Sequence, residues 1–521
     1  MNSTRLQKEF LGGTIILLLS FCLSLGAQTR PIVILGGTLI DGTGRAPVTD
    51  AAIVMQGGRF QQVGKRGQVP IPQGAEVIEA GGKTILPGLI DGHCHYPDWV
   101  RGELFLAYGV TTCPDLLGND DPKWILGQRE AIRKGVIRGP RIWATGMHVD
   151  GPPLPQAGAA KSEYPGIVRT PEEARKLVRK LVEMGVDGFK FYERMTPELT
   201  KVAAAEAHRL GRPVFGHSVD IFASADAGYQ GVEHFWSVVI TSIQDPPKKE
   251  EMIRREARGA AGLHDLNPGE FHLYMEPEFY RYIEPKMFDR IIRVMVDNNI
   301  HWSPTWATWF LPLSPRAAVL KQQELALLKD PRFAIPSESV GRVEGLLAFY
   351  EKVTPQRRAQ LLDAYRGLAD FARRFVAAGG KIHAGSDPNR ILPAFGLHVE
   401  LELLVEAGLS PLQAIQGASL NVAQAWRKDK DYGSVEKGKV ADLAIVRGDP
   451  MKDIAALRNV EMVFQDGSPR RERPEPRGPS GAPVDVVVHQ HSNDPVKHLR
   501  FYVAVKFRLH IEVKFPRVEV V

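Results

Sequence analysis

Short apolar runs separated by glycine, proline and aspartate follow the first 30 residues. Three of them, at 32–35, 52–55 and 76–79, are bounded by Gly-Gly, Asp-Gly or Pro, as is typical of β-strands and their turns. Strands of the same texture return at 442–446 and 460–465. We therefore expect one small β-sandwich domain built from both chain ends, residues 31–84 plus 427–468.

The rhythm changes between residues 85 and 426, where apolar runs of four to six residues alternate with amphipathic, helix-like stretches. Alternation of this kind predicts parallel strands with helical crossovers. The candidate strands are 89–95, 110–114, 141–145, 188–192, 213–217, 231–235, 301–304 and 381–386. Eight such units predict the α/β fold class and a (β/α)8 TIM barrel over 85–426, with its active site at the C-terminal ends of the strands. Charged insertions at about 240–285 and 310–355 are candidate lids.

The two chain ends have patterns of their own. Arg5 and Lys8 precede an apolar stretch at 11–25, which predicts a signal peptide at 1–27 and export to the periplasm or the extracellular space. An uncleaved N-terminal anchor is the alternative, and no later stretch is long enough to span a membrane after signal cleavage. Residues 470–521 read as a linker followed by a β-strand tail, for which the sequence indicates no role.

Composition excludes several classes of protein. The chain is 44% hydrophobic and 24% charged, which excludes a disordered protein. It has 66 basic and 60 acidic residues without a dense basic run, so no nucleic acid partner is expected. After signal removal only Cys94 and Cys113 remain, too few for a disulfide framework, and they are expected to be buried free thiols.

The strongest local motif is His93-Cys94-His95 at the end of the first predicted barrel strand. Side chains alternate in a strand, so His93 and His95 share a face and could bind one metal ion, while Cys94 points away. The motif alone is weak, because most such pairs are ordinary histidines.

Four further polar residues stand at the ends of later predicted strands: Lys190, His217, His234 and Asp387. Singly, each has a structural explanation, such as a core lysine or a turn-forming aspartate before proline. Together with the histidine pair, they form a nitrogen and oxygen set suited to zinc or a similar divalent metal. Lys190 does not fit as an ammonium group, because it would repel a cation.

The ordered set resembles the metal-dependent amidohydrolase superfamily. The motif Leu-Pro-Gly-Leu-Ile-Asp-Gly-His at 86–93 and the closing Gly-Ser-Val-Glu-Lys-Gly-Lys-Val-Ala-Asp-Leu-Ala-Ile-Val at 433–446 are similar to its imidazolonepropionase-like branch, which includes Xaa-Pro and Xaa-Arg dipeptidases. The resemblance covers about residues 31–467. It implies two divalent metal ions, expected to be Zn, with a carbamylated Lys190 across both. The implied metal ligands are His93, His95 and Asp387 for one ion, and His217 and His234 for the other. His148, at the end of the third strand, is implied to bind substrate.

The resemblance also implies a reaction. Two divalent ions can lower the pKa of a shared water towards about 7, which makes a bridging hydroxide available. Asp387 would be the catalytic residue that takes a proton from this water and delivers it to the leaving amine. The expected reaction is hydrolysis of an amide or other C–N bond in a small molecule, such as an N-acyl amino acid or a dipeptide, by a homo-oligomer. Dipeptidase relatives carry Tyr or Arg after the fifth-strand histidine, where this chain has Ser218.

Other interpretations stay open. One is a mononuclear deaminase or cyclic amidase of the same fold, and another is a metal-free scaffold, which would be marked by lost ligands. His383 is interpreted as a core histidine rather than a site residue. A group of aromatic residues could form either core or an apolar wall for a substrate: Trp236, Trp302, Trp306, Trp309 and Phe310.

Overall fold

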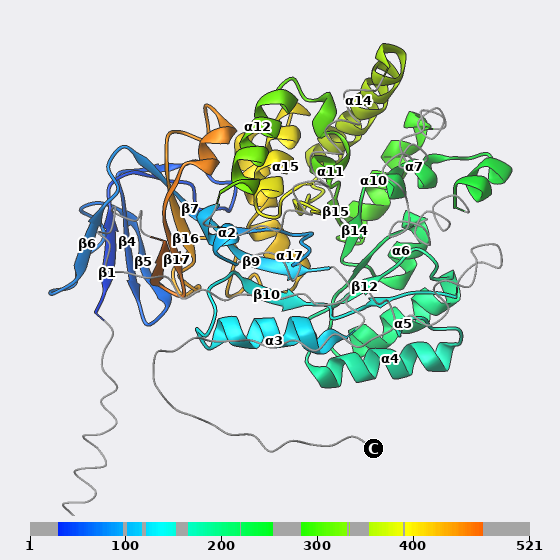
Figure 1. The fold of residues 1–521 in the computed structure, drawn as a ribbon, viewed down its shortest axis with the longest axis horizontal. Coiled ribbons are helices and arrows are strands. Elements are labelled where there is room, and N and C mark those ends of the chain that lie inside the picture. The colour runs from blue at the N-terminus through cyan, green and yellow to red at the C-terminus, as the bar shows by residue number, and fades with distance from the viewer. Residues whose placement is uncertain are drawn as a thin grey trace, which may run out of the picture. The chain divides into compact units, whose positions relative to one another are not determined.

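The computed structural model places most of the chain between residues 30 and 471 (Figure 1). The residues that it describes are 30–96, 102–116, 121–152, 165–218, 220–253, 283–330, 333, 354–388 and 391–471. All of them belong to one compact unit, Met1–Glu472. The predicted signal peptide, the tail beyond 471 and large parts of both predicted insertions lie outside the described residues.

Strands from the two ends of the chain form two sheets. A four-stranded sheet has the order β5-β4-β1-β6, and a six-stranded sheet has the order β18-β17-β16-β7-β2-β3. Their bounds are β1 Ile32–Leu35, β2 Thr38–Leu39, β3 Val48–Thr49, β4 Ala51–Gln56, β5 Arg59–Lys65, β6 Glu76–Glu79, β7 Lys83–Pro87, β16 Leu443–Arg447, β17 Val460–Gln465 and β18 Ser468–Arg471. Because β7 pairs antiparallel with β16, the two chain ends meet in one sheet.

These two sheets share an apolar core. Ile34 and Phe60 of the first sheet pack in the same buried cluster as Ile85 and Leu443 of the second. Alternating buried residues on the facing sides supply this contact, as the sequence pattern requires. The predicted pairing of early and late strands is thus present, while the assignment as a β-sandwich domain stays a prediction.

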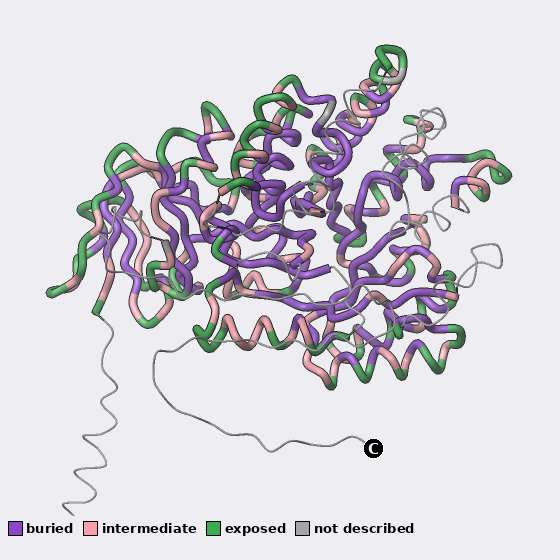
Figure 2. Tube along the Cα trace, viewed as in Figure 1, coloured by how far each residue is buried: buried purple, intermediate pink, exposed green. Residues whose placement is uncertain are grey.

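The middle of the chain forms parallel strands. One sheet has the order β10-β9-β8 and the other runs β11-β12-β13-β14-β15, with every pairing parallel. Their bounds are β8 Leu89–Ile90, β9 Val110–Asp115, β10 Arg141–Ala144, β11 His148–Val149, β12 Phe189–Phe191, β13 Val214–Gly216, β14 Gly231–Glu233 and β15 His301–Ser303. Figure 2 shows these strands mostly buried, as expected for parallel strands covered on both faces, and only the first residues of β10 and β11 are partly exposed.

The predicted eighth strand, 381–386, is an extended segment with one β-bridge, between Ile382 and Trp302 of β15. On its other side, the Gly92 amide donates to the Ala384 carbonyl at 2.8 Å, and the Asp387 amide donates to the His93 carbonyl at 2.8 Å. This segment therefore lies between β15 and the residues that follow β8. The assigned sheets do not close into a ring within the described residues, so a closed barrel remains a prediction.

A glycine makes the contact between these two segments close. A Cβ atom added to Gly385 would lie 2.3 Å from the backbone nitrogen of His93, which no side chain tolerates. Gly385 thus lets the backbone carrying Asp387 approach the backbone carrying His93.

Helices lie on both sides of the parallel strands (Figure 1). Their bounds are α2 Gly102–Ala107, α3 Pro122–Arg133, α4 Pro171–Met184, α5 Pro197–Arg209, α6 Ile221–Ala227, α7 Trp236–Ser242, α10 Phe288–Asp297, α11 Trp306–Trp309, α12 Ala317–Leu328, α14 Pro355–Ala377, α15 Phe395–Glu406, α16 Pro411–Gly417 and α17 Leu420–Ala425, with 3₁₀ turns at Pro285–Met287, Leu311–Leu313 and Ile454–Arg458. In the part of the chain that the structure describes, no helix has the length and apolarity needed to cross a membrane.

Helix α4 shows how the sequence sets these boundaries. The Thr170 side chain accepts a hydrogen bond from the Glu173 amide, and Pro171 occupies the first turn, where a missing N–H costs nothing. Gly185 ends the helix with φ of 95°, a left-handed conformation that glycine adopts without strain. Ala174 and Val178 lie on the buried face, four residues apart.

Two cysteines beside neighbouring parallel strands form a disulfide. Cys94 and Cys113 are bonded, with 5.8 Å between their Cα atoms, so the prediction of free thiols is wrong. Cys113 belongs to β9, and Cys94 follows β8, the parallel neighbour of β9. The pairing depends on strand neighbourhood, which two isolated cysteines in a sequence do not reveal.

Loss of the disulfide is expected to destabilise the protein. The bond joins residues 19 positions apart, and opening a loop of that length should lower the free energy of unfolding by about 3 kcal/mol. Urea denaturation of wild type and Cys113→Ala, followed by tryptophan fluorescence, measures the difference. Dithiothreitol should lower the wild-type midpoint and leave the variant unchanged. A wild-type midpoint that survives complete reduction, verified by thiol titration, would refute this expectation.

Candidate metal centre

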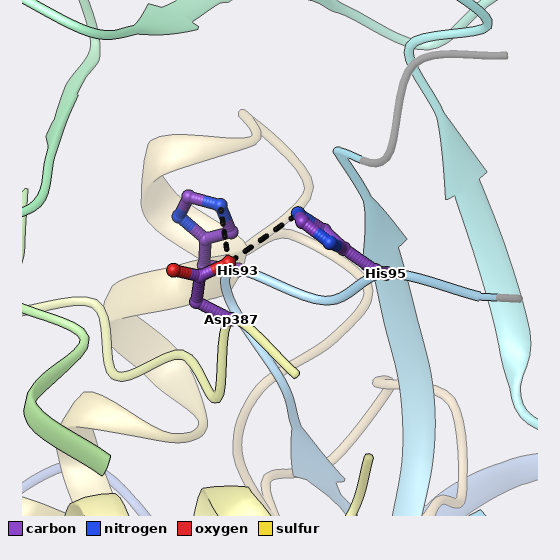
Figure 3. A group of neighbouring side chains, drawn as sticks. All are labelled: His93, His95 and Asp387. Carbon is purple, nitrogen blue, oxygen red and sulfur yellow. Dashed lines mark ion pairs between the residues drawn. The ribbon is translucent and has the colours of Figure 1, made fainter. Parts of the chain in front are cut away.

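His93, His95 and Asp387 converge at one point (Figure 3). Asp387 Oδ1 lies 3.6 Å from His95 Nε2 and 3.9 Å from His93 Nε2. Potential ligand atoms of these three residues all lie within 4.8 Å of one another. His93 and Asp387 are buried, while 13% of the surface of the His95 side chain is exposed to solvent. His93 and His95 lie in the segment after β8, and Asp387 lies in the segment after Ala384. Gly385 allows these two segments to approach each other, which positions the three side chains.

The two later histidines lie next to the same aspartate. His234 Nδ1 is 3.7 Å from Asp387 Oδ2, so the carboxylate faces the His93–His95 pair with one oxygen and His234 with the other. His217 follows β13 and His234 follows β14, its parallel neighbour. The Nε2 atoms of His217 and His234 lie 3.0 Å apart. The structure thus brings together all five predicted histidine and aspartate ligands.

Lys190, the middle residue of β12, is buried in the same region. Its Nζ atom has no hydrogen-bond partner among the described residues. Burial lowers the pKa of Lys190 to about 8, although Glu233, Asp387 and Glu193 oppose this shift. A buried amine with a lowered pKa and no partner is not an ordinary salt-bridged core lysine.

Backbone strain is concentrated at this site. His234, Thr305 and Asp387 have φ values of 64°, 52° and 43°, a left-handed region that non-glycine residues rarely adopt. His234 directly follows β14, Thr305 lies two residues after β15, and Asp387 follows the extended segment 381–386. Such strain persists only where the surrounding structure enforces it, and it is often associated with functional sites.

Oxygen atoms face the Nδ1 atoms of three of the histidines. Glu233 Oε2 lies 2.5 Å from His93 Nδ1, and Glu193 Oε1 lies 2.8 Å from His217 Nδ1. The Thr305 hydroxyl lies 2.8 Å from His234 Nδ1. In His93, hydrogen-bonded through Nδ1 to a carboxylate, the Nε2 atom then remains as the ligand atom.

Sequence reasoning missed these oxygen partners. A carboxylate within an apolar strand, directly before His234, was the signal for Glu233. Glu193 follows Lys190 by three residues and offered a weaker signal. Nothing in the sequence pattern distinguished Thr305 from an ordinary loop residue.

The buried histidines are neutral. Burial lowers the pKa of His93, and the neighbouring Lys190 lowers it further. The pKa values of His217 and His234 lie well below the usual value, again because of burial first. Neutral imidazoles have a free lone pair, which metal binding requires.

The residues present fit a divalent metal ion. The donors are imidazole nitrogens and a carboxylate, a set typical of zinc and similar metals. The partnerless Nζ atom of Lys190 is a further sign that a polar group belongs between these residues, because buried polar atoms are normally hydrogen-bonded.

His148 lies beside this group on β11, half-buried. Its Nε2 atom is 2.8 Å from the Leu116 carbonyl, and its ring stacks on Tyr192 with 4.3 Å between centroids. Tyr192 in turn lies 4.6 Å from the His217 ring. His148 is therefore near the second histidine pair, and its predicted role in substrate binding stays a prediction.

Ser218 follows His217, but its side chain is used within the fold. Its hydroxyl pairs with that of Ser224 at 2.6 Å.

The predicted group of aromatic residues divides into two. Trp236 stacks on His234 with 4.4 Å between centroids, and Trp309 packs edge-on against Trp236 at 5.0 Å. Trp302 packs against Phe371 instead, in the apolar core between β15 and α14. The first pair could line a substrate site, whereas Trp302 has a structural role.

The chain belongs to the amidohydrolase family. The model of that family matches residues 84–469, which include the parallel strands and every predicted ligand. The match also includes β16, β17 and parts of β7 and β18.

Individual relatives are distant. Among curated proteins, the chain is 31% identical over 116 residues to a 5-methylthioadenosine/S-adenosylhomocysteine deaminase of Symbiobacterium thermophilum, a match covering 20% of this chain and 27% of that protein. It is 22% identical over 443 residues to an adenine deaminase of Rubrobacter xylanophilus, covering 81% of this chain and 55% of that protein. The matches thus span less than two thirds of either relative.

Among solved structures, a Xaa-Pro dipeptidase with bound methionine in its active site has the same fold. The TM-score is 0.57 at 22% identity, covering 84% of this chain and 99% of that one. Family membership, with hydrolase and deaminase neighbours, supports a hydrolase acting on carbon–nitrogen bonds.

Proposed function

We propose that this protein is a metal-dependent amidohydrolase that cleaves an amide or related C–N bond in a small substrate. The observation that supports this most strongly is the convergence of His93, His95 and Asp387 within 4.8 Å. A metal-free scaffold would have no need to keep these donors together, buried and neutral.

The donors favour two ions. His93, His95 and Asp387 would hold one, His217 and His234 the other, and Lys190 as a carbamate would lie between them. The ions would supply an acidified water and polarise the substrate carbonyl. The Nζ atom of Lys190 is buried and has no hydrogen-bond partner among the described residues. This supports the carbamate, because a carbamate would place polar oxygen atoms beside that nitrogen.

Asp387 is the residue that we assign to proton transfer. One of its oxygens faces His93 and His95 and the other faces His234, so one oxygen could remain a ligand while the other accepts a proton from the attacking water. The same oxygen would then donate the proton to the departing amine, since amide hydrolysis needs a base first and an acid afterwards.

The family and the fold support a proposal for the substrate class. We propose an N-acyl amino acid or a dipeptide, because the fold is shared with a Xaa-Pro dipeptidase. Trp236, stacked on His234, would contribute an apolar wall beside the scissile bond.

Metal removal tests the proposed function. Dialysis against a strong chelator should abolish amine release from a panel of dipeptides and N-acyl amino acids, because every proposed catalytic step needs the occupied site. Adding Zn²⁺ back with bicarbonate should restore the activity. Full hydrolysis by a chain verified as metal-free would refute the proposal.

Deamination is a second candidate, favoured by the deaminases among the curated relatives. A deaminase would release ammonia from an aminated heterocycle and would need one ion. Assaying ammonia release from adenosine-type compounds separates the candidates, because hydrolysis of a dipeptide releases an amino acid instead.

We also infer export to the periplasm or the extracellular space, and a closed (β/α)8 barrel. The Cys94–Cys113 disulfide supports export, because disulfides persist in oxidising compartments. Hydrogen bonds on both sides of the segment 381–387 support the closed barrel.

A further inference from the structure

Glu233 connects three segments inside the parallel strands. It is the last residue of β14, and its side chain is fully buried. Oε2 lies 2.5 Å from His93 Nδ1, and Oε1 lies 3.2 Å from His383 Nε2. One carboxylate thus contacts the segment after β8 and the segment before Asp387.

The contact with His93 fixes which nitrogen of that ring is free. A carboxylate only accepts hydrogen bonds, so His93 must donate through Nδ1 to Glu233. The lone pair then resides on Nε2, the atom that faces Asp387 Oδ1. Without Glu233, the ring could carry its proton on Nε2 and turn away.

His383 holds the carboxylate in place from the other side. Its ring is fully buried, and its Nε2 atom can donate to Glu233 Oε1. His383 precedes Asp387 by four residues, so it belongs to the same segment as that ligand. This contact gives the buried histidine a partner and restrains the second oxygen of Glu233.

We infer that Glu233 is a positioning residue that orients His93 for metal binding, with His383 as its support. This inference rests on the proposed function, because it presupposes that His93 binds a metal ion. Oxygen partners of this kind fix the tautomer and orientation of metal-binding histidines, and losing one weakens metal affinity about 10- to 100-fold.

Zn²⁺ affinity of the full-length chain tests the inference. Glu233→Gln keeps the shape of the side chain but removes its charge, and it should raise the Zn²⁺ dissociation constant about 10- to 100-fold in a chelator competition assay. His383→Gln acts on the same carboxylate from the far side and should weaken binding by a smaller factor. Thermal denaturation of each metal-free variant reports separately on folding.

Glu324→Gln is the matched control. Glu324 is also a fully buried glutamate, but it lies in α12 and accepts a hydrogen bond from the Leu392 amide at 2.6 Å. Its substitution should leave Zn²⁺ affinity unchanged. A folded Glu233→Gln variant that binds Zn²⁺ as tightly as wild type would overturn the inference and leave the proposed function standing. A wild-type chain that binds no Zn²⁺ would overturn the proposed function itself.

Discussion

Asp387→Ala is expected to lower kcat/KM by about 10³- to 10⁴-fold, because the substitution removes the proposed proton-transfer group. It also removes the carboxylate that faces His93, His95 and His234, so bound metal should fall as well. Steady-state hydrolysis and elemental analysis of the same preparation measure both effects. His93→Ala should cause a comparable loss, since it removes a donor at the centre of the same group.

Asp387→Asn and Asp289→Ala complete this comparison. The asparagine variant keeps the shape of the side chain and an oxygen that can bind metal, yet it cannot take up a proton, so it should retain more metal than activity. Asp289 is an exposed residue of α10 paired with Arg374, and its substitution should change neither quantity. Near-wild-type turnover by Asp387→Ala would rule out the assigned role.

Lys190→Ala is the second substitution with a large expected effect. If a carbamate on Lys190 lies between two ions, removing the side chain should weaken metal binding by more than about 100-fold. This exceeds the effect of losing a hydrogen-bond partner of a ligand, which is about 10- to 100-fold. Activity should fall in parallel. Burial lowers the pKa of Lys190 to about 8, so the neutral amine that reacts with carbon dioxide is available in mildly alkaline solution.

Short carboxylic acids provide the decisive control for Lys190. Acetate or propionate could occupy the space left by the side chain and stand in for the carbamate, so they should restore part of the activity of Lys190→Ala. The same acids should leave Asp387→Ala inactive. A Lys190→Ala variant that keeps its full metal content would show that the amine is structural.

Much of the fold could be predicted from the sequence, because buried parallel strands appear as short apolar runs that alternate with amphipathic helical stretches. Helix α4 lies in the region where helix-like stretches are predicted, and capping and turn signals in the sequence flank its ends at Pro171 and Met184. The eighth predicted strand is different, because its hydrogen bonds are long-range and form only one β-bridge. Strand neighbourhood also explains the wrong prediction for Cys94 and Cys113.

The same distinction applies to the candidate site. His93, His95 and Asp387 could be named from strand ends alone, because parallel strands bring their C-terminal ends together. Glu233 stands out in the sequence as a carboxylate within an apolar strand, but its contact with His93 could not be predicted, since that contact joins residues 140 positions apart. The left-handed backbone of His234 and Asp387 was equally hidden, because tertiary packing rather than local sequence enforces it.

Metal content per chain is the most direct test of the central claim. The protein, produced with zinc and bicarbonate, should contain two divalent ions per chain by elemental mass spectrometry. A single ion would contradict the bridged centre and favour deaminase-like chemistry. A folded chain without bound metal would contradict the account as a whole.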